Sequence, residues 1–114
     1  MFGIKEIDAN ELAEWMKNGE SFRLVDVRSA QEVQQGMIEG GEFVPMHLIP
    51  LKAAEFSSDE KVVFYCRSGA RSGQVCAFLQ QQGVNNVYNL SHGILGWASA
   101  GYSLARPESL QVAG

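Results

Sequence analysis

The feature that most constrains the fold is a strand, a short polar loop and a helix that follow one another near the middle of the chain. Residues 62–65 read Val-Val-Phe-Tyr, a run in which every side chain is β-branched or aromatic. Such runs are typical of central strands in parallel sheets, because both faces of those strands are covered. A small, polar stretch follows over residues 66–71, and residues 72–82 have the apolar spacing of a helix. This order predicts an α/β protein.

Strand and helix signals alternate along the rest of the chain. Two helices begin with capping patterns, in which Asp8 is followed three residues later by Glu11, and Ser29 by Glu32. The alternation predicts one central sheet, mostly parallel and of about five strands, with helices on both faces. The other expected strands span residues 4–7, 22–27, 43–44 and 87–90, and the other expected helices follow Asp8, follow Ser29, and cover 51–56 and 94–100.

Length and charge limit the classes of protein to consider. A chain of 114 residues has the size of one domain, and we expect that domain over residues 1–104, with a loose C-terminal tail over 105–114. The net charge is -4, which gives no general attraction to nucleic acid or to anionic membranes. The sequence shows neither a membrane span nor a secretory signal, so we expect a cytoplasmic protein.

The two cysteines, Cys66 and Cys76, have different surroundings. They lack C-x-x-C spacing and a second Cys or His pair, which argues against a zinc site, although counting alone leaves a disulfide between them open. Cys76 lies mid-helix beside Val75 and Phe78, with no nearby cation, and is expected to be a structural core residue. Cys66 directly follows the central strand and is the candidate nucleophile.

The loop after Cys66 has the composition of an anion-binding site. Ligand sites in open α/β sheets form at the carboxyl ends of strands, where a tight loop can turn its N–H groups inward and the next helix points its positive end. Gly69 permits the backbone angles that such a loop needs. A free cysteine has a pKa of about 8.5, and this environment favours the thiolate. Lowering the pKa by about two units takes about 2.7 kcal/mol, more than a helix dipole supplies, so loop N–H groups must contribute.

Three segments of the chain, in order, resemble the rhodanese family. The loop Cys-Arg-Ser-Gly-Ala-Arg-Ser over residues 66–72 is similar to the active-site loop of that family, which begins with its catalytic cysteine. Residues 24–28, Leu-Val-Asp-Val-Arg, with Glu32 and Gly36, resemble the family's first signature. Residues 87–90, Val-Tyr-Asn-Leu, with Gly93, Ile94 and Trp97, resemble its C-terminal signature. The resemblance covers residues 4–104 and implies a single rhodanese-like domain.

The resemblance also implies roles for individual residues. Cys66 would become a persulfide by taking a sulfur from an anion such as thiosulfate, and would pass it to cyanide, a small thiol or a protein thiol, without metal or organic cofactor. Arg67 and Arg71 would attract and orient the donor, while Asp26 and Arg28 would support the structure. The backbone that surrounds the sulfur would come from Arg67, Ser68, Gly69, Ala70, Arg71 and Ser72.

Two positions depart from the family pattern and concern the rim of the pocket. The family often has Gly-His-Ile where this chain has Met37 as the middle residue, and His92 stands where a second glycine is usual. His92 either tunes the loop or faces solvent. The physiological donor and acceptor, the partner protein and the oligomeric state are left open by the sequence.

Two alternatives to sulfur transfer remain. Cysteine phosphatases of the cell-cycle dual-specificity type resemble this fold, but they separate Cys and Arg by five residues and place a histidine before the cysteine. Here four residues separate Cys66 from Arg71, and Tyr65 precedes the cysteine. A phosphoryl group needs a wider ring of donors than one sulfur atom, so the shorter loop favours sulfur transfer. The second alternative is a non-catalytic binding or sensing module, but such modules usually lose the cysteine.

Overall fold

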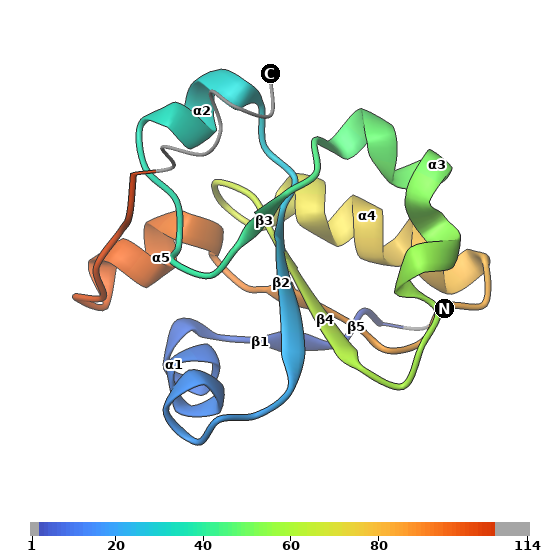
Figure 1. The fold of residues 1–114 in the computed structure, drawn as a ribbon, viewed down its shortest axis with the longest axis horizontal. Coiled ribbons are helices and arrows are strands. Elements are labelled where there is room, and N and C mark those ends of the chain that lie inside the picture. Colours follow the sequence, from blue (N-terminus) through green and yellow to red (C-terminus); the bar gives the residue numbers. More distant parts are fainter. Residues whose placement is uncertain (1–2, 107–114) are drawn as a thin grey trace.

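The computed structural model describes residues 3–106, in which strands and helices alternate as the sequence predicts (Figure 1). The strands are β1 (Glu6–Ile7), β2 (Phe22–Asp26), β3 (Glu42–Phe43), β4 (Lys61–Tyr65) and β5 (Val87–Leu90). The helices are α1 (Ala9–Lys17), α2 (Ala30–Gln34), α3 (Ile49–Lys52), α4 (Ala70–Gln81) and α5 (Gly93–Ser99), and the 3-10 turns η1 (Met46–Leu48) and η2 (Ala53–Phe56) flank α3. Within this part of the chain, every helix is too short or too polar to cross a membrane.

Strand β4 is the centre of a five-stranded sheet. The strand order is β1-β5-β4-β2-β3, and every pairing is parallel, which confirms the predicted architecture. All four residues of the apolar run, from Val62 to Tyr65, are completely buried. Because the strands run in one direction, their carboxyl ends meet at the same edge of the sheet, and Cys66 follows β4 at that edge.

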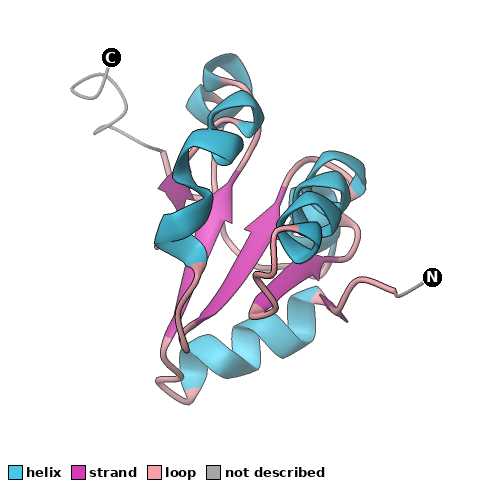
Figure 2. Ribbon diagram, turned by 90° about the vertical axis from the view of Figure 1, so that its right-hand side faces the viewer, coloured by secondary structure: helices cyan, strands magenta, loops and turns pink. Residues whose placement is uncertain are grey.

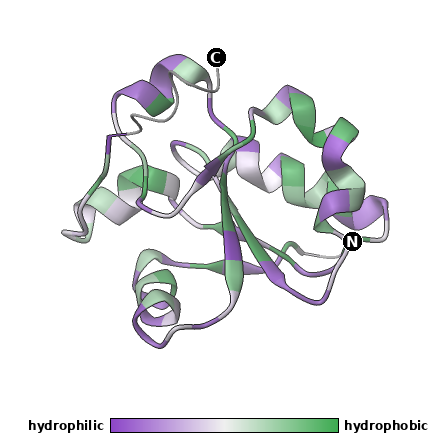
Figure 3. Cartoon of the chain, viewed as in Figure 1, coloured by the Kyte–Doolittle hydropathy of each residue, from purple (hydrophilic) through white to green (hydrophobic). Residues whose placement is uncertain are grey.

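The two faces of the sheet carry separate cores and separate helices, as Figure 2 shows from the side. Val62 and Phe64 pack on one face with residues of α3 and α4. Val63 and Tyr65 pack on the opposite face with residues of α1 and α5. Strand β4 consists mainly of hydrophobic residues, whereas α1 has both hydrophobic and hydrophilic residues around its axis (Figure 3). The prediction of helices on both faces is therefore confirmed.

Both predicted capping patterns are present as complete capping boxes. The carboxylate of Asp8 accepts from the N–H of Glu11 at 2.8 Å, and the carboxylate of Glu11 accepts from the N–H of Asp8 at 3.0 Å. The hydroxyl of Ser29 and the carboxylate of Glu32 form the same reciprocal pair at 3.3 and 3.1 Å. The second box starts α2 just beyond β2, so Glu32 lies near the carboxyl edge of the sheet.

Helix α4 begins at Ala70, two residues earlier than the sequence predicts. Gly69 has a φ of +103° and takes the N-cap position, and the N–H of Gly73 donates to its carbonyl at 3.0 Å. The small, polar residues before Ser72 looked like loop, but the left-handed angle at Gly69 lets the chain enter the helix directly. Ser72 therefore lies in the first helical turn, where N–H groups have no partner within the helix.

The last described residues run beside the segment that precedes β3. Ala105 forms an antiparallel bridge with Met37, with backbone hydrogen bonds of 2.8 and 2.7 Å between them. The sequence placed Ala105 in the tail, because a pairing between residues this far apart leaves no local signal. The rest of the expected tail, from residue 107 onward, lies outside the described residues.

Candidate active site

The side chain of Cys66 lies on the α4 face of the sheet, at the carboxyl end of β4. It is 1% exposed and belongs to the same hydrophobic cluster as Phe64 and Val75. A buried cysteine without polar neighbours behaves as a small, inert hydrophobic residue. Its reactivity therefore depends on the groups that contact the sulfur.

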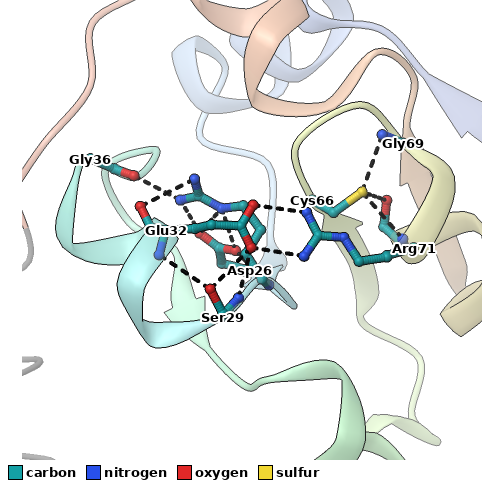
Figure 4. Close-up of polar contacts among 9 residues, drawn as sticks. Asp26, Ser29, Glu32, Gly36, Cys66, Gly69 and Arg71 are labelled. Atoms are coloured by element: carbon teal, nitrogen blue, oxygen red, sulfur yellow. Dashed lines mark hydrogen bonds and ion pairs between the residues drawn. The ribbon is translucent and has the colours of Figure 1, made fainter.

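Hydrogen-bond donors from the start of α4 converge on the sulfur of Cys66 (Figure 4). The N–H of Gly69 lies 3.1 Å from Sγ, and the N–H and hydroxyl of Ser72 each lie 3.4 Å from it. Both residues stand at the start of α4, so these N–H groups are ones that the helix itself cannot satisfy. Of the other predicted loop residues, Arg67, Ser68 and Ala70 are exposed.

These donors change the acidity of the thiol. Burial by itself would raise the pKa of Cys66, because a charged sulfur loses its hydration. Hydrogen bonds from the hydroxyl and N–H of Ser72, and from the N–H groups of Gly69 and Ser68, outweigh burial and leave the pKa below its ordinary value. The thiolate, which is the nucleophilic form of cysteine, is thereby favoured.

The start of α5 holds the cysteine loop in place through backbone hydrogen bonds. The N–H of Ile94 donates to the carbonyl of Cys66 at 2.9 Å, and the N–H of Leu95 donates to the carbonyl of Arg67 at 3.1 Å. Gly93 has a φ of +54°, and a Cβ there would lie 2.5 Å from each of these carbonyl oxygens. Only glycine permits this approach. The sequence associated Gly93 with the C-terminal signature, and the fold shows what it does.

Asn89 is a site residue that the sequence analysis missed. It lies in β5, next to the cysteine strand, and is 4% exposed. Its Oδ1 accepts from the hydroxyl of Ser72 at 2.6 Å, and its Nδ2 donates to the carbonyl of Gly69 at 3.1 Å. The available signal was a polar side chain in the otherwise apolar strand Val-Tyr-Asn-Leu, close to its carboxyl end.

The guanidinium of Arg71 is held by a carboxylate. It binds both oxygens of Glu32, at 2.8 and 2.9 Å, and these hydrogen bonds are the largest cause that lowers the pKa of Glu32 to about 2. The sequence predicted Arg71 as a cation for the incoming donor and did not foresee this partner. Arg67 is exposed and therefore has more freedom to meet an anion.

Asp26 and Arg28 form a buried ion pair beside the site. The guanidinium of Arg28 binds both carboxylate oxygens of Asp26, with distances of 2.7 to 3.2 Å, and donates to the carbonyl of Gly36 at 2.7 Å. Asp26 is completely buried and Arg28 is 6% exposed. These contacts are internal to the protein and connect the end of β2 to the end of α2, which favours structural roles for both residues.

The remaining residues singled out from the sequence lie around this centre. Cys76 is completely buried in α4, and both cysteines are free thiols. His92 is exposed at a φ of +66°, and its backbone N lies 3.3 Å from where a Cβ of Gly69 would stand. Met37 is 8% exposed.

Two surface hollows reach the cysteine loop and the Arg71–Glu32 pair. The larger has a volume of about 660 Å³ and is lined by Arg71, by Arg28 and the residues that follow it, and by β3 and the segment after it, including His47. The smaller, of about 200 Å³, is lined by Arg67, Glu32 and residues of α5. Each hollow thus presents one arginine of the cysteine loop.

Comparisons with known proteins show what this chain is similar to as a whole. The family called Rhodanese-like domain matches residues 8–100. A sulfurtransferase of Allochromatium vinosum is 47% identical over 105 residues, which cover 92% of this chain and 98% of that protein. The putative sulfurtransferase YtwF of Bacillus subtilis is 40% identical over 94 residues, covering 82% and 90%. The crystal structure of a thiosulfate sulfurtransferase from Pseudomonas aeruginosa superposes with a TM-score of 0.84 at 28% identity, over 92% of this chain and 21% of that one.

Proposed function

This chain belongs to the rhodanese family, and from that premise we propose that it is a sulfurtransferase in which Cys66 carries the transferred sulfur as a persulfide. Relatives named sulfurtransferase support sulfur transfer in general. The persulfide proposal rests on the environment of Cys66. Its buried sulfur accepts hydrogen bonds from N–H groups at the start of α4, and these lower the pKa of the thiol despite its burial.

In the first step the Cys66 thiolate attacks the outer sulfur of a donor such as thiosulfate. The S–S bond of the donor breaks, and sulfite leaves with the electron pair. Cys66 then carries one additional sulfur, which bears the negative charge. Arg67 attracts and orients the anionic donor at the mouth of the loop, with Arg71 contributing as far as its pairing with Glu32 allows.

In the second step a nucleophile attacks the outer sulfur of the persulfide. Cyanide, a small thiol or a protein thiol can serve in this role. The Sγ–S bond breaks and its electron pair stays on Sγ, which returns to the thiolate form. The donors from Gly69 and Ser72 stabilise that leaving thiolate. Two half-reactions through a covalent intermediate predict ping-pong kinetics.

Because a reactive free thiol such as that of Cys66 needs a reducing environment, we also propose that the protein acts in the cytoplasm.

Two observations disfavour phosphoryl transfer at the same site. The side chain of Tyr65, which occupies the position before the cysteine, packs on the face of the sheet opposite to Cys66. Arg71, the last arginine of the cysteine loop, lies one position earlier than the phosphatase arginine would, and its guanidinium is already paired with Glu32. A role as a non-catalytic module is disfavoured by the presence of Cys66 and its donors.

Mass spectrometry of the intact protein tests the proposal. Exposure to thiosulfate should add one sulfur atom, and cyanide should then remove it. The variant Cys66→Ala should not gain sulfur, whereas Cys76→Ala is the matched control and should gain it as the natural chain does. Sulfur gain that is lost in Cys76→Ala and kept in Cys66→Ala would contradict the assignment.

A further inference from the structure

The hydroxyl of Ser72 lies between two acceptors. Its oxygen is 2.6 Å from Oδ1 of Asn89 and 3.4 Å from Sγ of Cys66. The orientation of the Asn89 amide follows from its second contact, because Nδ2 donates to the carbonyl of Gly69 at 3.1 Å. The oxygen Oδ1, which can only accept, therefore faces Ser72. A hydroxyl has one proton and can donate it to only one of these two partners at a time.

The protonation state of the sulfur decides between the two partners. When Cys66 is a neutral thiol, its S–H can donate to the Ser72 oxygen while the Ser72 proton points to Asn89, so all three groups are satisfied. When Cys66 is a thiolate, the same arrangement would direct oxygen lone pairs at a negative sulfur. The hydroxyl then gains by turning its proton to the sulfur, but the buried Oδ1 of Asn89 loses a short hydrogen bond.

We propose that Asn89 is a positioning residue that keeps the Ser72 proton away from the sulfur until negative charge develops on Sγ. The inference rests on the proposed function, because it concerns the same cysteine. Asn89 thereby opposes ionisation of Cys66 and prevents the loop from over-stabilising the thiolate. A thiolate of very low pKa is a weaker nucleophile, so this opposition preserves the attack on the donor.

A Ser72 hydroxyl that can donate either to Asn89 or to Cys66 is compatible with both half-reactions. In the persulfide, Sγ is bonded to the outer sulfur and carries no charge, so the Ser72 hydroxyl continues to donate to Oδ1 of Asn89. When the acceptor removes the outer sulfur, the electron pair of the breaking bond moves onto Sγ. The hydroxyl then rotates about its Cβ–Oγ bond and donates to the new thiolate. The proton remains on the Ser72 oxygen throughout.

Charged and titratable groups near the site lie on several neighbouring elements and must be kept constant in any test. They are Asp26 at the end of β2, Arg28 just beyond it, Glu32 in α2, Arg67 and Arg71 around the start of α4, and His92 before α5. None of them contacts the Ser72 hydroxyl in the described hydrogen bonds, so substitutions of Asn89 and Ser72 leave this set unchanged.

The test measures the pH dependence of Cys66 alkylation in four proteins: the natural chain, Asn89→Ala, Ser72→Ala and the double variant. Asn89→Ala should lower the midpoint by about 0.5 to 1 pH unit, because the hydroxyl is released to the thiolate. At pH values above both midpoints the reaction with thiosulfate should slow roughly two- to threefold. In the Ser72→Ala background the same substitution should leave the midpoint unchanged. An unchanged or higher midpoint in Asn89→Ala, or an equal shift in both backgrounds, would overturn the inference.

A second measurement needs no variant of Asn89 and remains available if that variant does not fold. The side-chain carbonyl carbon of Asn89 should change its NMR chemical shift with the midpoint of Cys66 alkylation, and Ser72→Ala should remove most of that change. A constant shift, or one that persists in Ser72→Ala, would overturn the inference. Failure of the proposed function is recognised separately, because it appears as absent sulfur gain in the natural chain, whatever the midpoints show.

Discussion

Cys66 and Cys76 can be compared within one molecule, because both thiols are buried in the same hydrophobic cluster. Cys66 lies between β4 and α4, and Cys76 lies within α4. Burial, assisted by the charge of Glu6, raises the pKa of Cys76 to about 12. The pKa of Cys66 moves the other way. The difference comes from position: Cys76 lies mid-helix, where N–H groups are used within the helix, and Cys66 meets N–H groups that the first turn leaves free.

The largest expected effect is the difference in reactivity between the two thiols. With a pKa of about 12, only about one Cys76 in 10⁵ is ionised at pH 7. We expect iodoacetamide to modify Cys66 at least about 10³-fold faster than Cys76 in the folded protein, measured by mass spectrometry of the two peptides. In denaturant the two rates should converge. Similar alkylation rates for Cys66 and Cys76 in the folded state would contradict the claim that the two thiols differ in acidity.

Inserting one glycine between Ser68 and Gly69 should make Cys66 resemble an ordinary buried cysteine. The insertion moves the Gly69 and Ser72 donors relative to the sulfur without adding charge or bulk. Sulfur transfer should fall about 100-fold, and the alkylation midpoint of Cys66 should rise, while the thermal midpoint changes little. Phosphate binding should improve, because a wider ring suits a tetrahedral anion.

A glycine inserted after Gly83, in the exposed turn beyond α4, is the matched control for that experiment and should leave sulfur transfer intact. If the insertion at the cysteine loop also leaves turnover unchanged in a folded protein, loop length does not determine the chemistry. The main argument against the phosphatase alternative, which is the length of the loop, would then be lost.

The close approach of α5 to the cysteine loop can be tested with two glycines. Gly93→Ala and Gly83→Ala both place a side chain at positive φ, but only the first meets atoms, since a Cβ at Gly83 has nothing within 4 Å. We expect Gly93→Ala to lower the free energy of unfolding by about 2 kcal/mol more than Gly83→Ala, measured by urea denaturation. Equal losses would show that this contact does not hold the loop.

The smallest expected effect comes from removing the charge of Glu32. Its pKa is depressed to about 2, so its stabilisation is present above the unfolded value of about 4.5 and is lost as pH falls from there to about 2. Glu32→Gln keeps a residue able to form the capping box and should cost about 1 kcal/mol at pH 7, after allowance for solvent screening. Denaturation curves should show this difference vanishing at low pH. A constant difference would contradict the ion-pair account.

The same substitution should also affect the thiols unequally. Without Glu32 the charge of Arg71 is no longer neutralised, and the alkylation midpoint of Cys66 should fall by a few tenths of a pH unit. Cys76, which lies away from this pair in α4, should keep its slow reaction.

Much of the fold could be predicted because its signals are local. The run at residues 62–65 indicated a central parallel strand, and the two capping patterns located the starts of α1 and α2. The start of α4 was predicted two residues late, because small and polar residues after Gly69 are compatible with loop or helix until the angle at Gly69 is known. Cys66 and its loop were likewise recognised from a single continuous segment.

What the sequence by itself determined was therefore the kind of fold, the candidate nucleophile and the types of residue around it, since propensities, caps and motifs act over a few neighbouring positions. Only the tertiary structure decided which of those residues meet. Asn89 reaches Ser72 across 17 positions, and Arg71 meets Glu32 across 39. Such contacts depend on the order of strands in the sheet, and no local pattern encodes the distance between two residues that separate strands bring together.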